Sequence, residues 1–482
     1  MKYISTRGHG PMSFTDILLE GLAPDGGLYL PQSYPQLSSD DLRSLGEILV
    51  DEGYAQFAAE ILHLFIDDIP MHDLEQVCRR AYTKAKFGTD LIAPVDELEP
   101  GLWLAHLSQG PTAAFKDMAM QVLGQLFNYE LTRRDQTMTI LGATSGDTGS
   151  AAEFALLDAS RVQVFMLSPL GRMTAFQRGQ MYGIDTDRIV NVTVPGSFDD
   201  CQDLVKAVNA DAEFKSRHSI GAVNSINWAR LVAQVVYYIS SWFQASGGEG
   251  PVSFTVPSGN FGNICAGHVA RMMGTPISHL VCATNENNVL AEFFATGVYR
   301  IRTSTETFVT SSPSMDISKA SNFERFFFDL TGRDADEVRR LFGEELNRSG
   351  VINIRDKVYV TDPARVYGFQ TGVSTHADRV ATIADVFRRD GYLIDPHTAD
   401  AVKVAREHLG PEPMIALETA LPVKFGSITQ EAIGRVPPIP ARFAQVMEAE
   451  QHTVLCDRGV DQLKQIIEQR SIFRRDPSPQ AW

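Results

Sequence analysis

The stretch PVSFTVPSGNFGNICAGHVARMM, residues 251–273, passes from an apolar run through a loop of small residues into a helical pattern. Its apolar run predicts a buried strand at Val252–Val256, and its last part predicts a helix at Ile264–Met273. The stretch TMTILGATSGDTGSAAEFALL, residues 137–157, has the same order of strand, loop and helix. Strands that alternate with helices of this length indicate a parallel sheet covered by helices on both faces.

The same alternation extends to either side of these two stretches. Strands are also predicted at Met138–Gly142, Arg161–Leu167, Ile189–Val194, His279–Thr284 and Met414–Leu417. Helices are predicted at Ser39–Asp51, Tyr54–Leu64, Ser150–Leu157, Thr174–Met181, Asp200–Asn209 and Trp228–Phe243. Parallel sheets bind ligands at the carboxyl ends of their strands, so the loops that follow strands are where a site is expected.

The predicted domain organisation follows from changes in this alternation of strands and helices along the chain. Residues 1–95 read as a mainly helical N-terminal module. Residues 96–125 and 240–440 are predicted to form one α/β domain, and residues 126–239 a second. Residues 441–482 read as a charged helical tail that ends in the loose stretch RRDPSPQAW.

The composition limits the classes of partner. The 482 residues carry a formal net charge of -16, which argues against a nucleic-acid partner because phosphate backbones require a basic surface. No apolar run is long enough to cross a membrane, and the N-terminus has no apolar core of a signal peptide. The five cysteines are scattered without a CxxC pair, which favours the reducing cytoplasm and argues against disulfides and a bound metal.

Lys116, in GPTAAFKDMAMQ (residues 110–121), is the first candidate for chemistry. Gly110 and Pro111 form a turn, and Thr112 is predicted to be the N-cap of an apolar helix that carries Lys116 in its first turns. A lysine there is most often a surface residue that extends to solvent. A partly desolvated amine near a helix end would instead lose its proton more readily, as Schiff-base chemistry requires.

Two loops between a strand and a helix are suited to anions. The loop Pro257–Asn263 offers two glycines and backbone N–H groups at a helix N-terminus, which is a phosphate-binding arrangement. The loop Ala143–Gly149 offers hydroxyls and amides, but it lacks the Gly-Lys-Ser/Thr ending of a P-loop. Either loop alone would also be read as an ordinary turn. Together with Lys116 they fit pyridoxal phosphate (PLP), which has both a phosphate and an aldehyde.

The motifs GPTAAFKDMAMQ, LGATSGDTGSAA, SINWARLVAQ, PSGNFGNICAG and SMDISKASNFERF occur in this order, and the chain thereby resembles the threonine synthase family. The opening YISTRG with LAPDGGLYLP also resembles that family's longer form, which has an N-terminal extension. The resemblance implies a type II PLP fold, with two parallel-sheet α/β domains and the cofactor between them.

The resemblance also implies roles for individual residues. Lys116 would hold PLP as a Schiff base, and Thr419 would lie at the pyridine nitrogen. The cofactor phosphate would be bound by Gly259, Asn260, Phe261, Gly262 and Asn263. The substrate carboxylate and the cofactor's phenolic oxygen would be met by Ser145, Gly146, Asp147 and Thr148, and Thr144 is counted with the substrate-binding residues.

The substrate phosphate must meet positive charge in this acidic protein. The candidates are Arg172, Arg178, Arg230, Lys319, Arg325 and Lys424. Lys319, Arg325 and Lys424 are favoured because they lie in family motifs, although any one of these cations is more often a surface charge. Gln109, Glu418, Leu421 and Val423 depart from the usual family pattern, as does the stretch 178–182. His106 and His268 are expected to be structural.

The implied activity is conversion of O-phospho-L-homoserine and water to L-threonine and phosphate, the last step of threonine biosynthesis. The freed Lys116 amine would remove the α-proton, phosphate would leave from the γ-carbon, and water would add at the β-carbon. Two alternatives stay open. One is a dehydratase or phospho-lyase on the same fold, and the other is a PLP-binding protein without turnover.

Overall fold

The computed structural model describes residues 1–221, 223, 225–303, 305–355, 357 and 366–473. The predicted loose end RRDPSPQAW lies outside the described residues. The chain divides into two compact units. Unit 1 comprises Met1–Ala119 and Ser225–Pro438, and unit 2 comprises Met120–Asn224 and Ile439–Trp482.

Unit 1 is built on a six-stranded sheet in which only the edge strand β3 is antiparallel to its neighbour, within the described residues. The strands are, in spatial order, β13 (Phe369–Val373), β10 (Ile277–Thr284), β9 (Val252–Pro257), β14 (Met414–Leu417), β4 (Leu102–Ala105) and β3 (Val95–Glu99). Two antiparallel pairs lie outside this sheet, β1 (Tyr3–Ser5) with β2 (Tyr29–Pro31) and β11 (Val298–Arg300) with β12 (Val351–Asn353).

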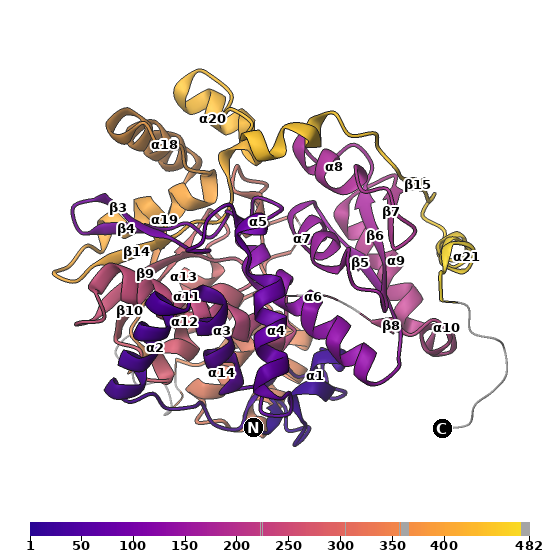
Figure 1. Cartoon of the computed structure of the whole chain (residues 1–482), viewed down its shortest axis with the longest axis horizontal. Coiled ribbons are helices and arrows are strands. Elements are labelled where there is room, and N and C mark those ends of the chain that lie inside the picture. Colours follow the sequence, from indigo (N-terminus) through magenta and orange to yellow (C-terminus); the bar gives the residue numbers. More distant parts are fainter. Residues whose placement is uncertain (222, 224, 304, 356, 358–365, 474–482) are drawn as a thin grey trace. The chain divides into compact units, whose positions relative to one another are not determined.

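Helices cover both faces of the unit 1 sheet (Figure 1). Alternate strand residues such as Val281 and Ala283 share a buried core with α18 (His376–Asp390), α19 (Pro396–Glu407) and α20 (Gly426–Ile433). Residues on the opposite face, such as Phe254, pack against Tyr238 of α11 (Trp228–Ser246), with ring centroids 4.7 Å apart. The remaining helical segments of unit 1 are α1 (Phe14–Glu20), α2 (Ser39–Asp51), α3 (Tyr54–His63), α4 (Met71–Ala81), α5 (Lys84–Phe87), α12 (Gly262–Met272), α13 (Val289–Thr296), η1 (Pro313–Met315), α14 (Phe323–Leu330), α15 (Ala335–Val338), η2 (Arg339–Glu345), α16 (Leu346–Ser349) and η3 (Pro422–Phe425).

Unit 2 contains a five-stranded parallel sheet. Its spatial order is β15 (Val454–Leu455), β7 (Ile189–Val194), β6 (Val162–Pro169), β5 (Met138–Ala143) and β8 (Ile220–Gly221). The helical segments of unit 2 are α7 (Asp147–Leu156), α8 (Ala175–Tyr182), α9 (Phe198–Ala210), α10 (Ala212–Arg217), η4 (Ala441–Met447) and α21 (Val460–Arg470). One further helix, α6 (Lys116–Arg133), begins in unit 1 and continues into unit 2.

The predicted α/β class with parallel sheets is confirmed, whereas the two units have other boundaries than the sequence suggested. Residues 1–95 belong to unit 1, since Tyr3 packs on Trp228 and Arg7 forms an ion pair with Glu324 at 2.9 Å. Residues 439–482 belong to unit 2, since β15 pairs with β7. Helix α11 falls entirely in unit 1, because it packs on α12 and α3 there.

Candidate active site

Three loops of unit 1 follow three adjacent parallel strands, β4, β14 and β9. The segment that leads to Lys116 follows β4, Thr419 follows β14, and Gly259–Asn263 follows β9. Because parallel neighbours have their carboxyl ends at the same edge of a sheet, the sheet order brings these three segments together. This edge is the best-supported place for a site in unit 1.

Lys116 lies half-buried at the first residue of α6, with its amine 5.7 Å from the ring centre of Phe115. The residues just before it run alongside the segment after β14. Phe115 N–H donates to Thr419 O at 2.8 Å, and Leu421 N–H donates to Ala113 O at 3.0 Å. The backbone thus fixes Thr419 next to Lys116, although the two are far apart in the sequence.

Thr112 is not the N-cap that the sequence suggested, because the helix begins four residues later. Its hydroxyl donates to Asp117 Oδ1 at 2.9 Å, and its amide donates to Asp117 Oδ2 at 2.8 Å. Burial raises the pKa of Asp117 to about 6, against the lowering effect of the Thr112 bonds and of the Lys424 charge. Gly110 leaves room for this carboxyl, since a Cβ there would lie 2.3 Å from Asp117 Cβ. These contacts fix the turn that precedes Lys116.

The Gly259–Asn263 loop has the geometry of an anion-binding turn. Phe261 has a φ of 62° and lies immediately before α12, so the chain turns sharply at the helix N-terminus. In the described part of the chain, the backbone N–H groups of residues 259–263 have no hydrogen-bond acceptor. Such amides at a helix start suit a phosphate. A Cβ on Gly259 would lie 3.1 Å from Met315 Cα, so glycine gives the neighbouring segment its close approach.

Thr419 is 6% exposed, and its hydroxyl makes no hydrogen bond with the described residues. Its backbone is fully used, since the N–H donates to Thr398 Oγ1 at 3.0 Å and the carbonyl accepts from Phe115. The hydroxyl is therefore available to a molecule bound beside Lys116. This environment fits the predicted contact with a ring nitrogen.

The loop Thr144–Thr148 lies in unit 2 and is tightly folded. Thr144 Oγ1 accepts the amides of Gly146 and Gly149 at 3.0 and 2.9 Å. Asp147, the first residue of α7, accepts from Gln177 Nε2 at 3.0 Å. Gly146 has a φ of 138°, a conformation that requires glycine. The predicted roles of Thr144, Ser145, Gly146, Asp147 and Thr148 toward substrate and cofactor stay predictions.

Three matches to family profiles cover most of the chain. The family described as "Threonine synthase N terminus" matches residues 2–82, "Pyridoxal-phosphate dependent enzyme" matches residues 88–348, and "Threonine synthase, C-terminal" matches residues 398–467. The threonine synthase of Corynebacterium glutamicum is 58% identical over 472 residues, which cover 97% of this chain and 98% of that protein.

Solved structures agree with these matches. The structure of a PLP-bound threonine synthase from Brucella melitensis has a TM-score of 0.93 and 41% identity, and the match covers 98% of this chain and 100% of that one. The yeast threonine synthase has a TM-score of 0.90 and 34% identity, covering 97% and 98%. The chain belongs to the threonine synthase family.

Membership in the threonine synthase family confirms the type II PLP fold and PLP as the cofactor. The residues of unit 1 fit that cofactor, since Gly259–Asn263 offers amides that have no acceptor among the described residues, and the backbone of Thr419 is bound to the residue before Lys116. The assignment of each of these residues stays a prediction, because the family matches test none of them singly.

Two of the three cations favoured for the substrate phosphate have their donors bound within the chain. Lys424 is fully buried, and its amine donates to Thr112 O at 2.9 Å. Arg325 is also buried, and it donates to Tyr29 O, Asn322 Oδ1 and Ile226 O at 2.9, 2.5 and 2.6 Å. Lys319 is exposed and has no hydrogen bond or ion pair with other described residues. Lys319 is therefore the favoured cation that is available to a ligand.

Arg230 is a cation to which sequence reasoning gave no preference. It is 6% exposed, yet no hydrogen bond or ion pair of its guanidinium exists within the described residues, and its Nη1 atom is completely buried. Burial lowers its pKa to about 10, against a smaller opposing effect of Tyr237. A buried charge without a partner is costly, so an anion is expected there. The sequence held one signal for it, since Arg230 is the one charged residue in the 19-residue helix α11.

Proposed function

We propose that the chain converts O-phospho-L-homoserine and water to L-threonine and phosphate, the last step of threonine biosynthesis. The observation that carries the choice of substrate is the buried Arg230, which has no counter-ion among the described residues. The amides of Gly259–Asn263 already provide for the cofactor phosphate, so Arg230 provides for a second anion. A dehydratase that acts on threonine has no substrate phosphate that would need this charge.

The hydrogen bonds of α11 support a location of Arg230 near the phosphate loop. Tyr237, two helical turns after Arg230, donates to Asn263 Oδ1 at 2.6 Å, and Tyr238 donates to the same atom at 3.0 Å. Lys319 lies in the segment that packs on Gly259, where Asn322 N–H donates to Asn260 O at 3.0 Å. We therefore assign the substrate phosphate to Arg230 and Lys319 in place of Arg325 and Lys424.

The other residues have complementary roles in this proposal. The Lys116 amine carries the cofactor and then takes the α-proton of the substrate, as its place beside Thr419 supports. Bound PLP supplies an electron sink for the negative charge that develops at the α-carbon. The amides and hydroxyls of Ser145, Gly146 and Thr148 bind the substrate carboxylate. Arg230 and Lys319 then stabilise the phosphate as it leaves the γ-carbon.

The proposal includes a cytoplasmic location. All five cysteines are buried and unpaired, which suits a reducing compartment. The helices within the described residues fall short of the length and apolar character that a membrane crossing requires.

Product identification tests the proposed reaction. The holoenzyme is incubated separately with O-phosphohomoserine, homoserine, serine and threonine, with a Lys116→Ala variant as the control. Threonine and phosphate from the first substrate alone are expected. Ammonia and 2-oxobutanoate, formed mainly from threonine, would establish the dehydratase instead, and no turnover of any of the four would favour a PLP-binding protein.

A further inference from the structure

A buried histidine–aspartate pair lies at the start of α19 in unit 1. Asp395 is the N-cap of this helix, and its Oδ1 atom lies 2.6 Å from His397 Nδ1. Both residues are completely buried. None of the roles proposed above uses this pair, although burying an imidazole and a carboxylate requires compensating contacts. Its further contacts therefore indicate what it does.

The imidazole of His397 is hydrogen-bonded to the segment of residues 314–315, which packs on Gly259 of the phosphate-binding loop. Ser314 N–H donates to His397 Nε2 at 3.1 Å. Since a backbone N–H only donates, Nε2 carries no proton, and the ring proton lies on Nδ1 toward Asp395. Ser314 O and Met315 Cα are the backbone atoms that a Cβ on Gly259 would meet, at 3.2 and 3.1 Å. His397 thus fixes the backbone on which Gly259 rests.

The carboxylate of Asp395 is connected by hydrogen bonds to the backbone of Thr419 and Ala420, at the other end of the proposed cofactor site. Its Oδ2 atom accepts the Ala420 N–H at 3.2 Å and the Thr398 hydroxyl. That hydroxyl in turn accepts the Thr419 N–H at 3.0 Å. Thr419 O accepts the N–H of Phe115, the residue before Lys116. One buried carboxylate is therefore connected to the backbone of Thr419 and, through His397, to the backbone under Gly259.

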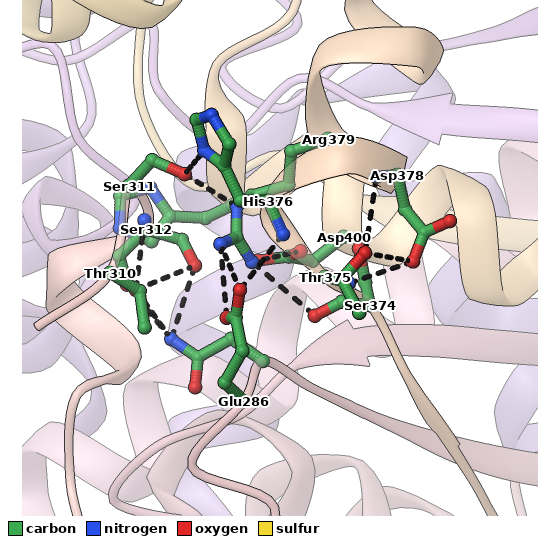
Figure 2. Close-up of polar contacts among 12 residues, drawn as sticks. Glu286, Thr310, Ser311, Ser312, Ser374, Thr375, His376, Asp378, Arg379 and Asp400 are labelled. Atoms are coloured by element: carbon green, nitrogen blue, oxygen red, sulfur yellow. Dashed lines mark hydrogen bonds and ion pairs between the residues drawn. The ribbon is translucent and has the colours of Figure 1, made fainter. Parts of the chain in front are cut away.

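A second buried polar cluster, centred on Arg379, binds the same segment at Ser311, three residues before Ser314 (Figure 2). Arg379, completely buried, donates to Ser311 Oγ at 2.7 Å and to Asp400 Oδ1 at 3.1 Å. It also pairs with Glu286 at 2.8 Å. This cluster anchors the segment at Ser311, whereas the hydrogen bond from Ser314 to His397 anchors it directly beside Gly259.

We propose that Asp395 and His397 are a positioning pair, which fixes the distance between the phosphate-binding loop and Thr419 so that PLP is held at both ends. The pair touches neither cofactor nor substrate in this proposal. The proposal rests on the cofactor site assigned above, but it does not depend on which amino acid the enzyme converts.

The test compares His397→Leu with His397→Gln and with a matched control. Leucine removes the acceptor for Ser314 N–H, whereas a glutamine oxygen at the same reach can restore it. The control is His268→Leu, because His268 is also buried and pairs with a buried aspartate, Asp329, at 3.0 Å. The readouts are PLP dissociation and absorbance in the holoenzyme, and amide hydrogen exchange at Ser314 and Ala420 in the apoprotein.

His397→Leu is expected to affect both the phosphate-binding loop and the backbone at Thr419, although it removes a hydrogen bond at the loop end alone. His397→Leu should weaken PLP affinity about tenfold, which is the effect of one hydrogen bond, and should shift the cofactor absorbance. Exchange should rise at Ala420 as well as at Ser314, His397→Gln should recover most of the affinity, and His268→Leu should keep both PLP affinity and spectrum.

Two outcomes would overturn the proposal. One is unchanged PLP affinity and spectrum in His397→Leu, and the other is faster exchange at Ser314 without any change at Ala420. If His397→Leu does not fold, Asp395→Asn provides the same test. Each carboxylate oxygen of Asp395 accepts a backbone N–H, and the NH₂ group of asparagine cannot accept a hydrogen bond in place of one of them. Failure of the parent enzyme to form threonine would refute the proposed reaction alone, since affinity and exchange are measured without turnover.

Discussion

Arg230 and Arg325 form a natural comparison, because both are buried arginines whose pKa is lowered to about 10 by burial. They differ in their partners. Arg325 donates to three acceptors of the chain, whereas Arg230 has none among the described residues. Replacing each by methionine, which has a similar length and no charge, therefore separates a cation that serves the fold from one that serves a ligand.

The two substitutions should change stability in opposite directions. A pKa of about 10 for Arg230 corresponds to about 3 kcal/mol against the charged form. Arg230→Met removes this cost, so in phosphate-free buffer the free energy of unfolding should rise by up to about 3 kcal/mol. Arg325→Met removes a similar burial cost, but it also removes the hydrogen bonds to Tyr29 O, Asn322 Oδ1 and Ile226 O, which contribute about 1.5–3 kcal/mol each, so the free energy of unfolding should fall by about 1–6 kcal/mol.

Arg230→Met should weaken the binding of substrate and phosphate, although the same substitution should stabilise the fold. A hydrogen bond to a charged group contributes about 1.5–3 kcal/mol, so Arg230→Met should raise KM for O-phosphohomoserine and weaken inhibition by inorganic phosphate about 10- to 150-fold. PLP affinity should stay the same, because we assign the cofactor phosphate to the amides of residues 259–263. Denaturant unfolding and steady-state kinetics measure both effects. A less stable Arg230→Met that phosphate inhibits as strongly as the parent would refute the reasoning.

The remaining predictions concern the cofactor. Borohydride reduction of the holoenzyme should leave PLP on the peptide that contains Lys116. The variant Lys116→Ala should lack this adduct, and its turnover should fall at least about 10²-fold. An adduct on another lysine would contradict the assignment. Gly259→Val should weaken PLP retention in dialysis at least about tenfold, because its Cβ would lie 3.1 Å from Met315 Cα, and equal retention would remove the loop from the site. Thr419→Val should change the cofactor absorbance and slow turnover about tenfold with an unchanged unfolding curve, whereas an unchanged spectrum would exclude contact with the ring.

The elements that the sequence predicted best are apolar runs bounded by turn residues. The strands at Ile189–Val194 and Met414–Leu417 have the predicted bounds. The short strands β4, β13 and β15 were not predicted, because two to five residues carry no clear period. Helices α18 and α19 lie in a region that the sequence left undefined, although the N-caps Thr375 and Asp395 signal their starts.

The site was predictable only as separate segments. Lys116 and the Gly259–Asn263 loop were identified by their local pattern, but residue patterns alone could not place Thr419 next to Lys116. That proximity depends on the pairing of β14 with β4 and on the hydrogen bonds between residues 113–115 and 419–421. The cations were ranked by motif, and a motif does not reveal that carbonyl groups already bind Arg325 and Lys424.

The net charge of -16 poses a problem for an enzyme whose cofactor and proposed substrate both carry phosphate. The Gly259–Asn263 loop offers backbone amides, which carry no net charge and need no counter-ion. Asp117 lies beside Lys424 and so compensates one of the buried cations near Lys116. Arg230 is left uncompensated among the described residues, and its field is little screened because it is buried. Selectivity for a second phosphate can therefore depend on Arg230, the one charged residue of α11, together with the exposed Lys319, while the net negative charge of the protein repels anions that do not fit.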